Sequence, residues 1–161
     1  MNARISAALA ISLGLLVVPI GAPQAAESPL AHFGGNWSGS GKIVVSNGSS
    51  ERIRCRGVYK PSDSGLALTL RCASDSYKFE LASDITYDAG SISGSWNETS
   101  RGVTGSIGGK ATATHIEASA SSVGFTASLT ISLRGNSQTV VIRSPGSEIS
   151  EVSISMARGG R

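Results

Sequence analysis

The chain of 161 residues has little charge and few aromatic rings. Asp, Glu, Lys and Arg make up 16% of it, and Phe, Trp and Tyr only 5%. Rings this scarce do not suffice for the two aromatic girdles of a transmembrane barrel, so the composition argues against an outer-membrane protein. The formal net charge of +3 at pH 7 is too small to indicate nucleic acid or an anionic membrane as the partner.

The sequence also lacks the motifs of catalysis and of metal or phosphate binding. It contains no G-x-S-x-G nucleophile elbow, and neither Gly41-Lys42 nor Gly109-Lys110 has the spacing of a phosphate-binding loop. His32 and His115 are the only histidines, and no group of His, Cys and acidic residues has metal-ligand spacing. We therefore predict no enzyme, no cofactor and no metal site. A hydrolase that pairs His115 with a serine is kept as a minor alternative.

The first 26 residues have the layout of a secretory signal peptide. Arg4 precedes an apolar run at residues 5–18, and a stretch of helix-breaking and small residues then ends at Ala26. The run is shorter than the ~20 apolar residues of a membrane-spanning helix. We expect cleavage after residues 1–26 and a mature chain, residues 27–161, with the length of one domain. The protein would then be periplasmic or secreted, with no stable membrane span after cleavage.

From Asn36 onward the chain shows the period-two alternation of β-strands. In residues 125–133, for example, Phe, Ala, Leu and Ile occupy every second position, and Thr or Ser the others. No window has sustained helical periodicity, and turn-forming residues such as Gly108-Gly109 separate the runs. The predicted strands are residues 37–46, 52–60, 66–73, 77–87, 91–97, 103–107, 111–119, 124–133, 138–144 and 150–157.

The links between these strands are too short for crossover helices, so consecutive strands should pair antiparallel. About ten short strands are typical of a β-sandwich or an up-and-down barrel. We favour a meandering barrel, or a strongly curled sheet, because nearly every link has hairpin length. A small outer-membrane barrel is kept as an alternative, since alternation alone does not say whether the apolar face points in or out.

The two cysteines, Cys55 and Cys72, lie in the clearest predicted hairpin. If they face each other, Tyr59 faces Leu68, and residues 62–65 remain as the loop. Neither C-x-x-C spacing nor a nearby histidine points to redox or metal chemistry. We therefore predict a structural disulfide, as is usual in exported proteins. The cross-link should stabilise the fold by ~3 kcal/mol.

The same hairpin carries the densest group of arginines. The register that pairs the cysteines sets Arg56 opposite Arg71 on the other face of the sheet. Like charges in this position are unfavourable unless water or an anion screens them. The candidate anion-binding face consists of Arg52, Arg54, Arg56 and Arg71. Acidic neighbours that would instead mark an ordinary solvated face are Glu51, Asp63 and Glu80.

The two tryptophans, Trp37 and Trp96, have similar surroundings in the sequence. Each follows a glycine two residues earlier, Gly35 or Gly94, which leaves space for the ring or for a neighbouring backbone. We expect the rings either to fill the end of the core or to line a ligand cavity.

Residues 35–41, Gly-Asn-Trp-Ser-Gly-Ser-Gly, resemble the Gly-x-Trp first strand of lipocalin-like (calycin) barrels, which enclose small apolar ligands. The resemblance implies an arginine late in the chain that covers Trp37, for which Arg134 and Arg143 are the candidates. It spans too few residues to carry over the calycin ligand cavity. Over its whole length the chain resembles small exported β-domain proteins of alphaproteobacteria, which implies export and supplies no activity.

The predicted function is that of an exported, non-enzymatic binding protein or envelope-associated protein. Its partner would be a small ligand, an envelope component or another protein, and not nucleic acid. The arginine face is the candidate exposed site, whereas Trp37 and Trp96 would mark a cavity.

Overall fold

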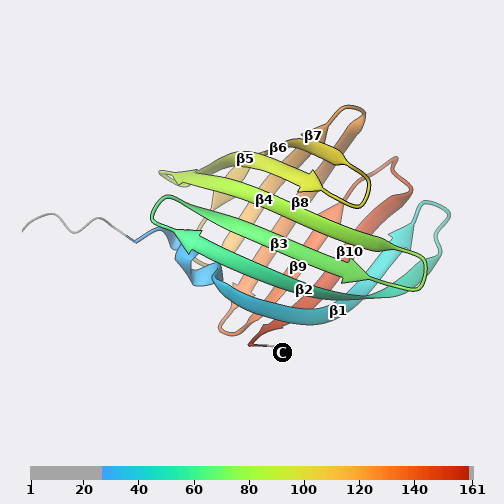
Figure 1. Cartoon of the computed structure of the whole chain (residues 1–161), viewed down its shortest axis with the longest axis horizontal. Helices are drawn as coiled ribbons and strands as arrows, with labels where there is room; N and C mark the ends of the chain where they lie inside the picture. Colours follow the sequence, from blue (N-terminus) through green and yellow to red (C-terminus); the bar gives the residue numbers. More distant parts are fainter. Residues whose placement is uncertain (1–26, 160–161) are drawn as a thin grey trace, which may run out of the picture.

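Alternating apolar and polar residues produce ten strands, each paired antiparallel with the next, and β10 pairs with β1 to close a barrel (Figure 1). The computed structural model describes residues 27–159, so the predicted signal peptide at residues 1–26 lies outside the described residues. The elements are the 3-10 helix η1 (Pro29–Phe33) and the strands β1 (Gly35–Val45), β2 (Ser50–Ser62), β3 (Gly65–Ala73), β4 (Lys78–Asp88), β5 (Ser91–Glu98), β6 (Val103–Ala111), β7 (His115–Ser122), β8 (Phe125–Arg134), β9 (Ser137–Arg143) and β10 (Ile149–Arg158).

The predicted all-β antiparallel meander is confirmed. The sheet forms a closed barrel and not a sandwich. The apolar face of the sheet points inward. On β8, for example, Ala127, Ile131 and Leu133 are buried, while Thr126 and Ser128 are exposed on the outside. Because the ring has no free edge, none of the ten strands offers an unpaired backbone for aggregation.

The β2–β3 hairpin has the predicted register. Cys55 is paired with Cys72 and joined to it by a disulfide, and both are buried on the inner face. Tyr59 lies opposite Leu68, as expected. The loop is shorter than predicted, because Ser62 still pairs with Gly65 and only two residues remain for the turn.

The predicted turn at Gly108-Gly109 is wrong. Both glycines lie inside β6, and the chain turns at residues 112–114 instead. A Cβ on Gly109 would lie only 2.0 Å from the carbonyl oxygen of Glu117 on β7, so the glycine permits a close approach of two strands. At the true turn, Thr112 Oγ1 accepts a hydrogen bond from the His115 N–H at 3.1 Å.

The segment before β1 forms the short helix η1 and closes one end of the barrel. Ser28 caps the helix, and Leu30 and Phe33 are fully buried. We call this the η1 end; the turns that join β1 to β2, β3 to β4, β5 to β6, β7 to β8 and β9 to β10 form the opposite end, the loop end. In Figure 1, η1 lies at the left of the barrel and these turns lie toward the right.

The seam between β1 and β10 depends on two glycines of β1. A Cβ on Gly39 would lie 1.9 Å from the Ser155 carbonyl oxygen, and one on Gly41 would lie 1.8 Å from that of Ser153. Side chains with a Cβ therefore do not fit at either position unless the two strands separate. Only glycine lets β1 approach β10 closely enough to complete the ring.

Replacement of Gly39 by valine should therefore weaken the fold. We expect Gly39→Val to lower the free energy of unfolding by at least about 2 kcal/mol, because the added atoms collide with backbone that cannot rotate away. Urea denaturation followed by tryptophan fluorescence measures the change. The matched control is Ser40→Val on the same strand, with its side chain on the outer face, which should stay within about 0.5 kcal/mol of wild type. Equal losses in both variants would contradict the close approach at the seam.

Candidate functional site

The loop end of the barrel leads into an internal cavity of about 460 Å³. Its lining comes from inward-facing positions of β3 to β10 and is mainly apolar. Side chains that form the body of the cavity include Leu70, Phe79, Trp96, Ile107, Phe125 and Ile142. Pockets of about 300–1,000 Å³ with such a lining are typical of sites for small organic ligands.

The cavity arises from an uneven distribution of side-chain volume along the barrel. At the η1 end, Leu30, Phe33, Trp37 and Tyr59 are at most 3% exposed and fill the interior. Around the cavity, several inward positions carry small residues, among them Ser83, Ala120 and Ala127. Because the interior of a barrel widens with strand number, ten strands leave a space that these small residues do not fill.

The structure places the two tryptophans in different roles. Trp37 belongs to the core at the η1 end, where its Nε1 donates to the Phe33 carbonyl oxygen at 2.9 Å. Trp96 lines the cavity, donates to the Ser106 carbonyl oxygen at 3.1 Å and lies 5.7 Å from the Phe125 ring. Both expectations for these rings therefore apply, one to each.

The glycines preceding the tryptophans make room for backbone or for other side chains, not for the rings. A Cβ on Gly94 would lie 2.0 Å from the Asp84 carbonyl oxygen. The space for the Trp96 ring comes from Gly105, its partner on β6, where a Cβ would lie 2.7 Å from the indole Nε1. That signal is visible only once the β5–β6 register is known.

The arginine that covers Trp37 is Arg158, not Arg134 or Arg143. The Arg158 guanidinium carbon lies 4.6 Å from the centre of the indole, and its nitrogens donate to the carbonyl oxygens of Gly34 and His32. Arg143 instead pairs with Glu151 on the outer face at 2.9 Å. Arg158 thus ties the last strand to the segment that closes the η1 end.

Three charged residues line the cavity toward the loop end: Glu98, Arg101 and Glu148. Burial raises the pKa of the Glu98 carboxyl, but hydrogen bonds from the backbone N–H groups of Glu80, Ser100 and Arg101 outweigh burial, so the net pKa is lowered. Glu148 accepts a hydrogen bond from the Tyr77 hydroxyl at 3.1 Å, which links the β9–β10 turn to the β3–β4 turn.

The predicted arginine face lies on the outside of the barrel. Arg56 is opposite Arg71, as expected, but Arg71 is neutralised by Glu80, which lies 2.8 Å from its Nη2. In the described part of the chain, no ion pair involves Arg52, Arg54 or Arg56. The four arginines therefore share one surface, on which Arg71 is already compensated.

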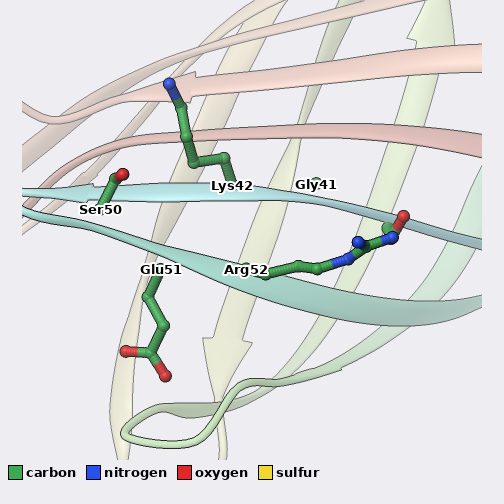
Figure 2. A pocket seen from close by; sticks show the side chains of 6 residues that line it. Gly41, Lys42, Ser50, Glu51 and Arg52 are labelled. Atoms are coloured by element: carbon green, nitrogen blue, oxygen red, sulfur yellow. The ribbon is translucent and has the colours of Figure 1, made fainter.

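Lys42, which the sequence argument did not include, adds a further cation to this surface. It lies opposite Arg52 across the β1–β2 pair, beside a shallow outer depression of about 380 Å³. Figure 2 shows the Lys42 and Arg52 side chains extending from the two strands, while Glu51 points away from Lys42. Glu51 accepts a hydrogen bond from the Ser76 N–H at 2.8 Å.

His115 lies on the outer face of β7, between Ser132 and Glu117. Its Nδ1 is 3.2 Å from Ser132 Oγ, and its Nε2 is 3.1 Å from Glu117 Oε1. Neither the cavity nor the outer depression is lined by these three residues. His32 lies in η1, where its carbonyl oxygen accepts from Arg158.

Two further observations concern residues 27–159, the range that the structure describes. No three His, Cys, Asp or Glu side chains within this range lie close enough together to hold a metal ion. No helix in the same range is long and apolar enough to cross a membrane.

Comparison with known proteins supports the fold. No protein-family model and no curated protein matches the chain. Among solved structures, the chain is similar to Rv2717c from M. tuberculosis, with a TM-score of 0.62 and 14% identity over 81% of this chain and 95% of the other. It is also similar to the S-type phycobiliprotein lyase CPES from Guillardia theta, with a TM-score of 0.57 and 11% identity over 82% and 91%. At these identities the similarity shows the barrel fold alone.

The η1 end contains a buried tyrosine with a strongly shifted pKa. Burial raises the pKa of the Tyr59 hydroxyl to about 12, and the nearby Gln138 side chain offsets part of this effect. Neither polar atom of the Gln138 amide has a hydrogen-bond partner in proper geometry within residues 27–159. Ionisation of Tyr59 is therefore unfavourable in the folded protein.

The pKa of Tyr59 is higher in the folded protein than its ordinary 10.0. The contribution of the neutral Tyr59 to the free energy of unfolding is therefore complete below pH 10 and is lost as the pH rises to about 12. At pH 12 the loss should be about 2 kcal/mol. Urea denaturation of wild type and Tyr59→Phe at both pH values measures it, since the variant has no hydroxyl to ionise. The same pH dependence in both proteins would show that Tyr59 ionises freely.

Proposed function

We propose that this protein is an exported, non-enzymatic carrier or sensor that binds a small, mainly apolar ligand inside the barrel. The observation that carries the proposal is the cavity of about 460 Å³ reached from the loop end, with an apolar lining from eight strands. A folded protein that leaves this much apolar surface unfilled loses packing energy, which a ligand would restore.

Export is the second part of the proposal. Disulfides persist in the periplasm and outside the cell and are rare in the cytosol, so the Cys55–Cys72 bridge supports an oxidising location. The signal-peptide layout of residues 1–26 points the same way. Periplasmic and secreted locations are equally compatible with both observations.

The orientation of the sheet favours this proposal over an outer-membrane barrel. The lipid-facing side of a transmembrane barrel is an apolar band. Here the outward positions carry Ser, Thr, Lys and Arg, as on β8 with Thr126 and Ser128 and on β2 with Arg54 and Arg56. Such a surface is suited to water.

The line of Ser132, His115 and Glu117 does not favour a hydrolase over a binding protein. A serine hydrolase also needs free N–H donors to stabilise the developing oxyanion. His115 and Ser132 are directly paired across β7 and β8, where backbone N–H groups serve the strand pairing. The proposal therefore remains a binding function.

Filling the cavity should abolish ligand binding. Ala120 lines the cavity, and Ala120→Phe would place a ring in the space that the ligand needs. We expect this variant to bind the neutral apolar dye N-phenylnaphthylamine at least about tenfold more weakly than wild type. The measurement is a fluorescence titration with the dye.

The matched control is Ser119→Phe, which adds the same ring one residue earlier on the outer face of β7. Its affinity for the dye should equal that of wild type. If wild type does not bind the dye at all, or if both variants bind it like wild type, the ligand site is not this cavity.

A second candidate function, the binding of an anion on the outer face, is favoured by one observation. Arg52, Arg54 and Arg56 lie in a row opposite β1, and Lys42 extends the row, without an ion pair among the described residues. Four neighbouring cations attract phosphate, sulfate or sugar acids.

Phosphate titration tests this second candidate. Backbone amide shifts of β1 and β2 in NMR spectra should move on addition of phosphate, and Arg56→Ser should weaken the effect severalfold. Arg71→Ser is the control, because Glu80 already neutralises that guanidinium and its loss should change phosphate affinity less. Identical, negligible shifts in wild type and Arg56→Ser would mean that the face is only solvated.

A further inference from the structure

We propose that the ligand of the cavity is an amphiphile with an anionic head group, and that Arg101 binds this head group at the loop end. The inference rests on the proposed function, because it assigns a chemistry to the ligand of the same cavity. It comes from the way in which the three charged residues of the lining are compensated.

Arg101 lies where the apolar lining meets solvent. Its guanidinium carbon is 5.1 Å from the centre of the Phe79 ring, and Phe79 is stacked on Tyr77 at 6.3 Å with nearly parallel planes. The guanidinium therefore lies over an aromatic ring at cation–π distance. The side chain is 47% exposed, which leaves room for an anion.

Glu98 forms an ion pair with Arg101, with 3.8 Å between Oε2 and Nη1, but accepts no hydrogen bond from its guanidinium. The carboxylate accepts hydrogen bonds from the backbone N–H groups of Ser100 and Arg101, at 3.1 and 2.9 Å, and so fixes the β5–β6 turn. A third bond comes from the Glu80 N–H at 3.0 Å. Glu98 is thus a positioning residue whose charge is shared among several N–H groups.

The other acid of the lining, Glu148, is likewise engaged, because it accepts from the Tyr77 hydroxyl at 3.1 Å. Among the residues that line the cavity, all of them within residues 27–159, Arg101 is the one cation. A carboxylate, sulfate or phosphate above the cavity would form charge-assisted, two-point hydrogen bonds with its guanidinium. The apolar tail of the same molecule would lie inside the cavity against the faces that Trp96 and Phe125 turn toward it.

Competition between four decyl compounds tests this assignment. Decanoate, decyl sulfate, decanol and decyltrimethylammonium share one tail and differ in the head group. Each is used to displace N-phenylnaphthylamine from the protein. On wild type we expect decanoate or decyl sulfate to bind at least about tenfold more tightly than decanol, and the cationic compound to bind most weakly. The comparison of the first two distinguishes a carboxylate from a sulfate head group.

Variants at position 101 give the second readout. Arg101→Gln should reduce the affinity for the anionic compounds about tenfold more than the affinity for decanol or the dye, and the remaining dye binding shows that the variant is folded. Arg101→Lys should keep the preference for an anion. Arg134→Gln, the same change at an exposed position at the end of β8, should behave like wild type.

The outcomes separate the two proposals. If the dye and decanol bind but the anions have no advantage, or if Arg101→Gln keeps their advantage, the head-group assignment is wrong while the cavity remains a ligand site. A preference for the cationic compound would likewise overturn it. If neither the dye nor any decyl compound binds to wild type, the proposed function itself fails.

Discussion

The closure of ten strands into one ring is the constraint on which the rest of the structure depends. Once β10 pairs with β1, every second residue of every strand points into a shared interior whose width is set by strand number, not by the side chains available to fill it. The closure itself requires glycine at positions 39 and 41 of β1, where a Cβ would collide with the β10 backbone. Without these two glycines β1 and β10 would not pair, and the barrel would have no enclosed interior.

The chain fills that interior unevenly, so that one end is packed with side chains and the other opens into the cavity. At the η1 end, Arg158 stacks on Trp37 and donates to the carbonyl oxygens of the incoming segment, so the first and last strands are fixed together there. At the loop end, the interior opens into the cavity, and the charged residues Glu98, Arg101 and Glu148 belong to its lining. The disulfide between Cys55 and Cys72 joins β2 to β3 between these two ends.

Local patterns in the sequence predict the strands and the β2–β3 register, because alternation and turn chemistry act over a few residues. The same patterns fail where a residue's role depends on a distant strand. Gly108-Gly109 has the pattern of a turn, but glycine pairs also occur where two strands approach closely. Only the position of Glu117 on β7 shows that Gly109 belongs to the second case. Arg158 was not identified as the cover of Trp37, since this contact follows from the pairing of β1 with β10.

The cavity and the charged residues of its lining are harder still to predict from the sequence. The space depends on the summed volumes of inward side chains from eight strands, and no single strand reveals it. The arginines of β2 form a recognisable group in the sequence because they occupy alternate positions of one short stretch. Arg101 stands alone in a turn, and its role depends on the nearby Phe79 and Glu98. Conversely, Arg71 belongs to the dense group yet is already paired with Glu80.

The most direct test is anomalous X-ray diffraction from crystals of the protein grown with a decanoate that carries bromine on its last carbon. We expect the bromine peak inside the barrel, in the cavity lined by Trp96 and Phe125, with the carboxylate beside Arg101 at the loop end. A bromine peak found only on the outer face, or an interior filled by side chains at the loop end, would contradict the view that this barrel encloses its ligand.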